Sequence, residues 1–169
     1  MRKTEKRTIM IYRMKQFIQG LLARTTKEDL AFIEKYLNKE EIKLFKKLRV
    51  SEQYHSLQVA YGCTSKFPHN ITLIRAALLH DIGKIGSNLT LINKSIVVIC
   101  IRLNFKKDIL PKFIQKSLYY KNHHPKIGYD ILSNMKVEAD ILYLIKNHHN
   151  EYCISSKTLE TLKYYDNMY

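Results

Sequence analysis

The pair His80 and Asp81 is the feature that most constrains how this chain can fold. It follows residues 74–79, IRAALL, which are apolar except for one arginine and are typical of a buried helix. An aspartate that such a helix carries into the interior is costly to bury unless a positive charge or hydrogen-bond donors meet it. A divalent metal ion is the strongest partner of this kind. The pair therefore predicts a metal site where a core helix ends.

Turn-forming residues are scarce, and this sets the expected fold class. The 169 residues include five glycines and three prolines, with no repeated glycine-rich turns, so we expect an all-α domain. The length suits one structural unit with a sizeable core. We expect residues 1–50 to form an N-terminal helical extension that packs on a helical bundle over residues 51–169.

Capping residues give the first helix boundaries. Thr26 and Asn38 are each followed by acidic residues, which predicts two helix starts of the capping-box type. A further helix over about 52–61 would be closed by Gly62. The helix that carries the His–Asp pair is expected over about 71–83, so that the pair lies in its last turn.

The second half of the chain is expected to continue as helices. Pro125 is predicted at the favoured first position of a helix. Another helix is expected around 137–149, and Ser155 or Ser156 would cap the last one. The β-branched segment within 89–107 fits either a buried helix, which we favour in a helical chain, or a strand.

Charge and cysteine content narrow the functional classes. The net charge of +14 suits an anionic substrate or nucleic acid. Solvated lysine faces explain the same excess, and nucleic acid is a possible partner that we do not favour. The longest apolar run, residues 96–101, is too short to cross a membrane. Three separated cysteines form no CxxC pair, so we expect a protein of the reducing cytoplasm.

The positions of the histidines indicate a metal-binding site. Of the seven, five fall at expected helix ends, and His55 lies on a helix before them. A bundle can collect side chains from several helices around one metal centre. Imidazoles mixed with the carboxylates of Asp81 and Asp166, without thiolates, suit Mn, Fe, Ni, Co or Zn. Two such divalent ions bridged by Asp81 would activate a water molecule as hydroxide and clamp a phosphoryl oxygen.

Residues 78–84, LLHDIGK, resemble the signature of the HD-domain superfamily of metal-dependent phosphohydrolases, in its HDIG form. The resemblance covers roughly residues 55–166 and implies an HD-domain bundle over 51–169. It implies that one metal ion is bound by four residues that match the family pattern: His55, His80, Asp81 and Asp166. It also implies that Lys84, which follows HDIG, points toward the phosphate of the substrate.

The layout is most similar to the HD-GYP phosphodiesterase branch. Residues 124–132, HPKIGYDIL, resemble its HP segment, and His148 with His149 resemble its HH pair. This resemblance implies that His124, His148 and His149 complete a dinuclear centre. Ser51 stands where that branch has a glutamate, and the DGxGYP loop after the HH pair is missing, so cyclic di-GMP is not implied as the substrate.

We therefore expect a phosphohydrolase or phosphodiesterase that acts on a nucleotide or related phosphate ester, with Asp81 and Lys84 as catalytic residues. The alternative is a non-catalytic nucleotide sensor or a basic nucleic-acid-binding module that keeps the metal site. The substrate, the native metal, the oligomeric state and the catalytic competence of the site stay open. So does the choice between His123 and His124, although the adjacent proline favours His124.

Overall fold

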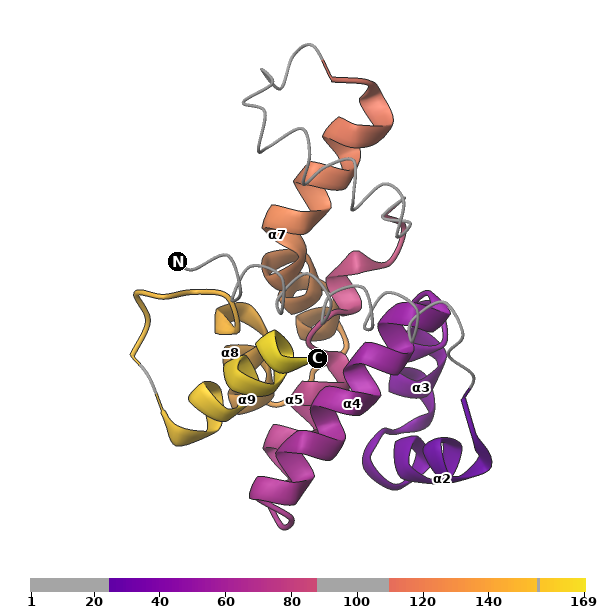
Figure 1. Ribbon diagram of the computed structural model, residues 1–169, viewed down its shortest axis with the longest axis vertical. Helices are drawn as coiled ribbons and strands as arrows, with labels where there is room; N and C mark the ends of the chain where they lie inside the picture. The colour runs from indigo at the N-terminus through magenta and orange to yellow at the C-terminus, as the bar shows by residue number, and fades with distance from the viewer. Residues whose placement is uncertain (1–24, 88–109, 155) are drawn as a thin grey trace, which may run out of the picture.

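The computed structural model describes residues 25–87, 110–154 and 156–169, and these residues contain helices and no β-strand (Figure 1). The all-α prediction is therefore confirmed. The segment 89–107 lies outside the described residues. The elements are α2 (Lys27–Tyr36), α3 (Lys39–Phe45), α4 (Val50–Lys66), α5 (Ile71–Leu79), the short 3₁₀ helix η1 (Ile82–Lys84), α7 (Lys112–Asn134), α8 (Ala139–Asn147) and α9 (Lys157–Met168).

The starts of α2 and α3 are set by local side-chain hydrogen bonds. Thr26 Oγ1 accepts from the backbone N–H of Asp29 at 3.1 Å, and the Asp29 carboxylate accepts from the Thr26 N–H at 2.8 Å. Asn38 and Glu41 form the same reciprocal pair. Both predicted capping boxes are confirmed, because this interaction depends on residues three apart and needs no tertiary contact. Ser156, one of the two serines considered, caps α9.

The bundle is centred on the hairpin of α4 and α5. Helix α8 packs on α5, α9 packs on α4, and α7 packs on α8 and η1. Figure 1 shows the first half of α7 extending beyond these helices. One cluster of buried apolar side chains runs through the bundle and includes Phe45, Leu57, Leu78, Ile141 and Leu162. The assignment of residues 1–50 as an extension stays a prediction, but α2 and α3 contribute to this same core.

The predicted end of the fourth helix at Gly62 is wrong. Helix α4 continues through this residue to Lys66. A Cβ atom at position 62 would overlap the ring of Tyr165 on α9, so Gly62 allows α9 to lie directly on α4. The glycine is used for close helix packing, and the structure does not use it as a helix terminator.

The predicted position of Pro125 is also wrong. Pro125 lies inside the 23-residue helix α7, which begins at Lys112. A proline within a helix removes one backbone hydrogen bond, and in this structure a side chain uses the carbonyl that is freed. The helix that carries the His–Asp pair also ends earlier than expected, at Leu79, and η1 follows it.

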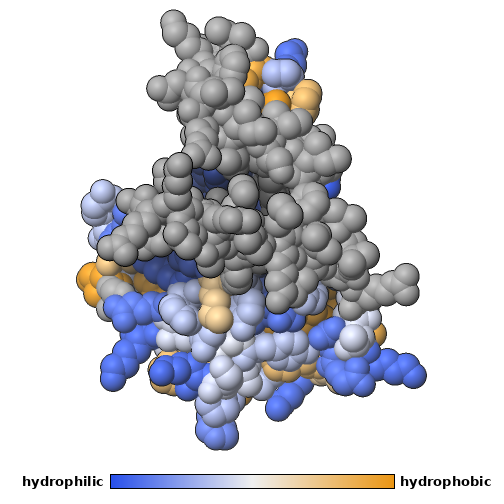
Figure 2. Space-filling view, in the orientation of Figure 1, coloured by the Kyte–Doolittle hydropathy of each residue, from blue (hydrophilic) through white to orange (hydrophobic). Residues whose placement is uncertain are grey.

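On the face shown in Figure 2, the surface of the described residues is largely hydrophilic, with small hydrophobic areas at its margins. Among the described residues, no helix combines the length and apolar character that crossing a bilayer requires.

Candidate metal centre

The structure brings the predicted ligands together at one end of the α4–α5 hairpin. They come from five parts of the chain: α4, the segment from the end of α5 into η1, α7, the end of α8, and α9. Three overlapping groups of residues could each hold a metal ion, because the nitrogen and oxygen ligand atoms within each group lie within 4.8 Å of one another. The groups are His55, His80 and Asp81; His80, His148 and Asp166; and His124, His148 and His149.

Two glycines allow the His80–Asp81 segment to approach α7. A Cβ at Gly83 would overlap the carbonyl of His124 and crowd the backbone nitrogen of Gly128. A Cβ at Gly128 would lie 3.2 Å from the nitrogen of Gly83. The backbone of η1 therefore lies directly against that of α7, which places Asp81 Oδ1 3.4 Å from His124 Nε2.

Three buried imidazoles are oriented by backbone carbonyls. The Nδ1 atom of His80 lies 2.8 Å from the Ala77 oxygen, that of His124 2.9 Å from the Lys121 oxygen, and that of His148 2.6 Å from the Ile145 oxygen. A carbonyl can only accept, so each Nδ1 carries the proton and donates it. Each Nε2 atom is thereby directed into the centre, which is the usual arrangement of metal-binding histidines.

The Nε2 atoms of His124 and His148 face each other at 3.1 Å. Both rings already carry a proton on Nδ1, so in their neutral forms two lone pairs meet at this point. Burial lowers the pKa of His124 to about 4 and lowers the pKa of His148 well below its usual value. Burial therefore disfavours a second proton on either ring, and a cation is the partner that this pair of lone pairs fits.

The carboxylates complete the donor set. Asp81 is fully buried, and its Oδ1 atom has no hydrogen-bond partner among the described residues. Asp166 Oδ1 accepts a hydrogen bond from His55 Nε2 at 3.0 Å and lies 3.2 Å from His80 Nε2. His149 Nδ1 is 3.7 Å from Asp166 Oδ2. Asp81 Oδ1 and His80 Nε2 each lie near an acidic or a basic side chain but make no well-aligned hydrogen bond to the described residues. Both are metal-ligand atoms, so the residues present fit a metal centre.

The charged groups of the centre shift one another's pKa values. Burial opposes a charge on His80, but the Asp81 and Asp166 carboxylates raise its pKa to about 9. Burial also opposes ionisation of the two aspartates, yet Lys84 and His80 lower the pKa of Asp81, and His55 and His80 lower that of Asp166. A proton on His80 thus balances the acidic groups when no metal ion does so.

Lys84 lies between two acidic side chains. Its Nζ atom is 2.5 Å from Asp81 Oδ2 and 3.4 Å from Glu52 Oε2. Burial opposes its charge, but these two carboxylates raise its pKa above the usual value. No sequence motif indicated Glu52, although it precedes His55 by three positions and so lies on the same side of α4. The role of Lys84 toward substrate stays a prediction.

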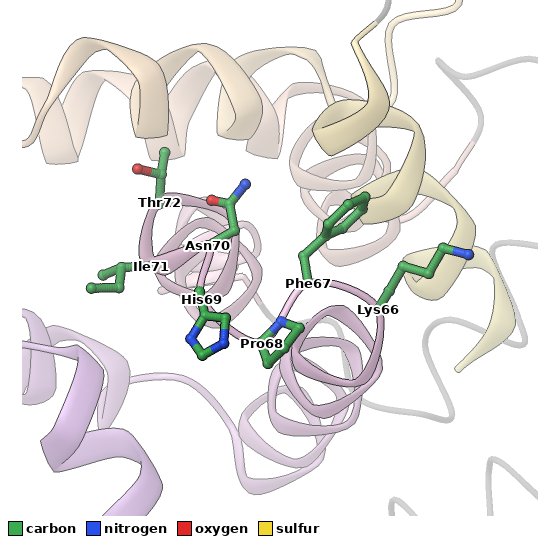
Figure 3. A pocket seen from close by; sticks show the side chains of 7 residues that line it. All are labelled: Lys66, Phe67, Pro68, His69, Asn70, Ile71 and Thr72. Carbon is green, nitrogen blue, oxygen red and sulfur yellow. The ribbon is translucent and has the colours of Figure 1, made fainter.

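The other candidates lie outside the centre. His123 is exposed and stacks on Tyr119, whereas His124 is buried. Asp130 is exposed and pairs with Lys126. Exposed His69 lines an open pocket at the α4–α5 turn, together with the neighbouring residues 66–72 (Figure 3). That turn is at the end of the hairpin opposite to the metal centre, so the pocket is separate from it.

Comparison with protein families agrees with this geometry. A family model described as HD domain matches residues 48–167. The matched segment covers most of the chain and contains every predicted ligand, from His55 to Asp166. Comparisons with curated proteins and with solved structures gave no match. On the family match, the chain belongs to the HD domain family.

Proposed function

We propose that this protein is a metal-dependent phosphohydrolase that acts on a nucleotide or a related phosphate ester through two divalent transition-metal ions. The observation that carries the proposal is the close approach of His124 Nε2 and His148 Nε2, two lone-pair donors 3.1 Å apart. Beside them lies Asp81 Oδ1, which makes no hydrogen bond to the part of the chain that the structure describes. Such a set of donors is stabilised by cations. Mn, Fe, Ni, Co and Zn all suit the mixture of imidazole and carboxylate.

The positions of the two Asp81 oxygens support a dinuclear arrangement. Oδ2 lies 3.5 Å from His80 Nε2 and 3.9 Å from His55 Nε2, whereas Oδ1 lies 3.4 Å from His124 Nε2. One carboxylate oxygen thus faces each group of histidines. We assign His55, His80, Asp81 and Asp166 to one ion. The second ion is assigned to His124, His148 and His149, with Asp81 shared.

Bound divalent ions supply Lewis acidity, which generates a nucleophile from water and neutralises charge on phosphoryl oxygens. The chain's own residues hold those ions and place a fixed positive charge beside them. Lys84 remains charged because its neighbours raise its pKa, and its amino group lies within the same cluster. We propose that this ammonium group contacts a phosphoryl oxygen of the substrate, where it stabilises negative charge.

The segment between α8 and α9 favours a compact substrate. Helix α8 ends at Asn147, and α9 begins at Lys157. The connection is tied down, because Tyr143 Oη donates to the Ile154 carbonyl at 2.7 Å and Lys163 Nζ donates to the Asn150 carbonyl at 2.5 Å. A short, anchored connection leaves little room for a dedicated loop. We therefore favour a nucleotide, a linear dinucleotide or a small cyclic nucleotide over cyclic di-GMP.

Turnover of a chromogenic phosphodiester by the full chain, with and without added Mn, tests the activity. Mononucleotides, cyclic nucleotides and cyclic di-GMP are then compared by kcat/KM, with Asp81→Asn as the inactive control. We expect metal-dependent hydrolysis that this substitution abolishes. A protein that binds metal but hydrolyses no phosphate ester would instead be the non-catalytic sensor or nucleic-acid-binding module. Cyclic di-GMP as the best substrate would contradict our choice of substrate class.

A further inference from the structure

We propose that Pro125 is a positioning residue, which creates within α7 the free backbone carbonyl that orients His124 toward the metal centre. This inference rests on the proposed metal centre and adds a residue that does not itself touch metal or substrate. It follows from a hydrogen-bond pattern that three of the buried histidines share.

Each of these histidines donates its Nδ1 proton to the carbonyl three residues earlier: His80 to Ala77, His124 to Lys121 and His148 to Ile145. The first and last of them are the C-cap residues of α5 and α8. The carbonyls in the last turn of a helix have no backbone donor within the helix. At these two positions, the helix end itself supplies the acceptor.

His124 is different because it lies in the interior of a long helix. There the carbonyl of Lys121 would accept the backbone N–H of residue 125. Residue 125 is proline, which has no N–H, so this carbonyl is left for another donor. His124 Nδ1 donates a hydrogen bond to the Lys121 carbonyl at 2.9 Å and makes a longer contact of 3.2 Å with the Tyr120 carbonyl. Pro125 thus reproduces, inside α7, the acceptor that a helix end provides elsewhere.

The neighbouring His123 provides an internal comparison. Its Nδ1 atom lies 2.8 Å from the carbonyl of Tyr119, which also accepts the backbone N–H of residue 123 in a regular helix. That imidazole is exposed and stacks on the Tyr119 ring. A histidine can therefore share an occupied helical carbonyl at the surface, but the buried His124 has one that its helix leaves free.

The backbone at His124 is held independently of this hydrogen bond. A Cβ at Gly83 would overlap the His124 carbonyl, so η1 packs directly against this turn of α7. With the backbone held there, the direction of the imidazole depends on the acceptor at Nδ1. Loss of that acceptor should release the ring and allow the proton to move to Nε2, which would block the atom that faces His148.

The test is Pro125→Ala in the full chain, with Pro111→Ala as the matched control. Pro111 is the N-cap residue of the same helix and lies far from the centre along α7. Alanine at 125 restores the backbone donor, so Pro125→Ala should fold at least as stably as the wild type in thermal unfolding. Long-range ¹H–¹⁵N NMR of the metal-free protein reads the tautomer of His124. Competition with a chromogenic chelator then measures the affinity for each ion.

We expect Pro125→Ala to turn His124 from the Nδ1–H tautomer into a mixture. The affinity for the ion bound by His124, His148 and His149 should fall about 10–100-fold, as for other residues that orient metal ligands. The ion at His55 and Asp166 should be retained, and Pro111→Ala should match the wild type. An unchanged His124 tautomer or an unchanged affinity in Pro125→Ala would overturn the inference. Because the tautomer is read without metal or substrate, this outcome is separate from any failure of the proposed hydrolysis.

Discussion

Two clusters of ionisable side chains can be compared in this protein: the metal centre and the Arg75 network, which consists of Arg75, buried Glu41 and exposed Glu138. In the Arg75 network, the guanidinium donates to Glu41 at 2.7 Å and to Glu138 at 2.7 Å. Glu41 is fully buried, and its other oxygen accepts the Asn38 N–H that begins α3. The chain itself therefore supplies both the acids and the cation.

The metal centre contains more acceptor atoms than the donors of the described residues satisfy. Lys84 and a proton on His80 offset the two aspartates. The Nε2 atoms of His124 and His148 still face each other, and Asp81 Oδ1 makes no hydrogen bond to the described residues. A buried polar group without a partner is costly, and natural proteins keep such groups mainly where a ligand or function uses them. The difference lies in the charges: both acids of the Arg75 network pair with one cation of the chain, although Arg75 Nε makes no hydrogen bond to the described residues. The metal centre instead gathers ligand atoms from several helices that could hold an external cation.

The largest effect is expected from Asp81→Ala, because this carboxylate faces both groups of histidines. The variant should lose both metal ions, from about two per chain to near none, together with activity. His124→Ala should lose mainly one ion. Elemental analysis of the purified proteins measures this, with Asp130→Ala as a surface control. Equal metal content in the wild type and Asp81→Ala would remove the contrast between the two clusters.

The second prediction breaks the Arg75 network. Arg75→Ala leaves Glu41 buried without its cation and should lower the free energy of unfolding by about 3–5 kcal/mol. Metal content per folded chain should not change. Glu138→Ala is the matched control, since this partner is exposed and its loss should cost less than about 1 kcal/mol. Urea unfolding of the metal-free proteins measures both, and equal losses in the two variants would contradict the assignment.

The third prediction removes the chain's own cation from the metal centre. Lys84→Ala should retain both ions, because the amino group is no metal ligand, but should lower turnover about 10–1000-fold through loss of one electrostatic donor. Lys126→Ala, at an exposed pair on α7, is the control. Elemental analysis and steady-state kinetics are measured on the same samples. Unchanged kinetics would mean that Lys84 only neutralises the neighbouring carboxylates of Asp81 and Glu52 and does not contact the substrate.

The smallest effect concerns the proton that balances the centre. The pKa of His80 is raised to about 9, so at neutral pH a metal ion must displace its proton. Metal affinity should therefore fall as the pH is lowered from about 9 toward 6.5, by up to about tenfold per pH unit for this one proton. Titration calorimetry in buffers with different ionisation enthalpies counts the protons released. Affinity that does not vary over this range would mean that His80 is neutral before metal binds.

Local patterns predicted much of the fold. The capping boxes at Thr26 and Asn38 form as expected because their hydrogen bonds join residues three apart. The HDIG motif and the later histidines predicted which side chains would meet, and the structure brings all seven together. The family resemblance carried this expectation, because these residues lie far apart in the sequence and a helical bundle can collect them at one place.

The errors arose where glycine and proline were interpreted as helix boundaries. Helix α4 continues through Gly62, and the absence of a Cβ there leaves space for the ring of Tyr165. That ring belongs to α9, about a hundred residues later in the sequence. Pro125 continues α7, since η1 packs against the helix there and His124 uses the freed carbonyl. Local preference favours an end at both positions, and tertiary contacts outweigh it.

By itself, the sequence determined the helical class and the helix starts with capping residues, because these depend on composition and short spacing. The set of side chains expected in the centre came from the resemblance to the HD-domain family. Only the tertiary structure decided how those side chains are directed. The facing Nε2 atoms of His124 and His148, and the position of Lys84 between Asp81 and Glu52, depend on distances between helices. Those distances are set by the packing of side chains from separate parts of the chain, for which no local pattern is sufficient.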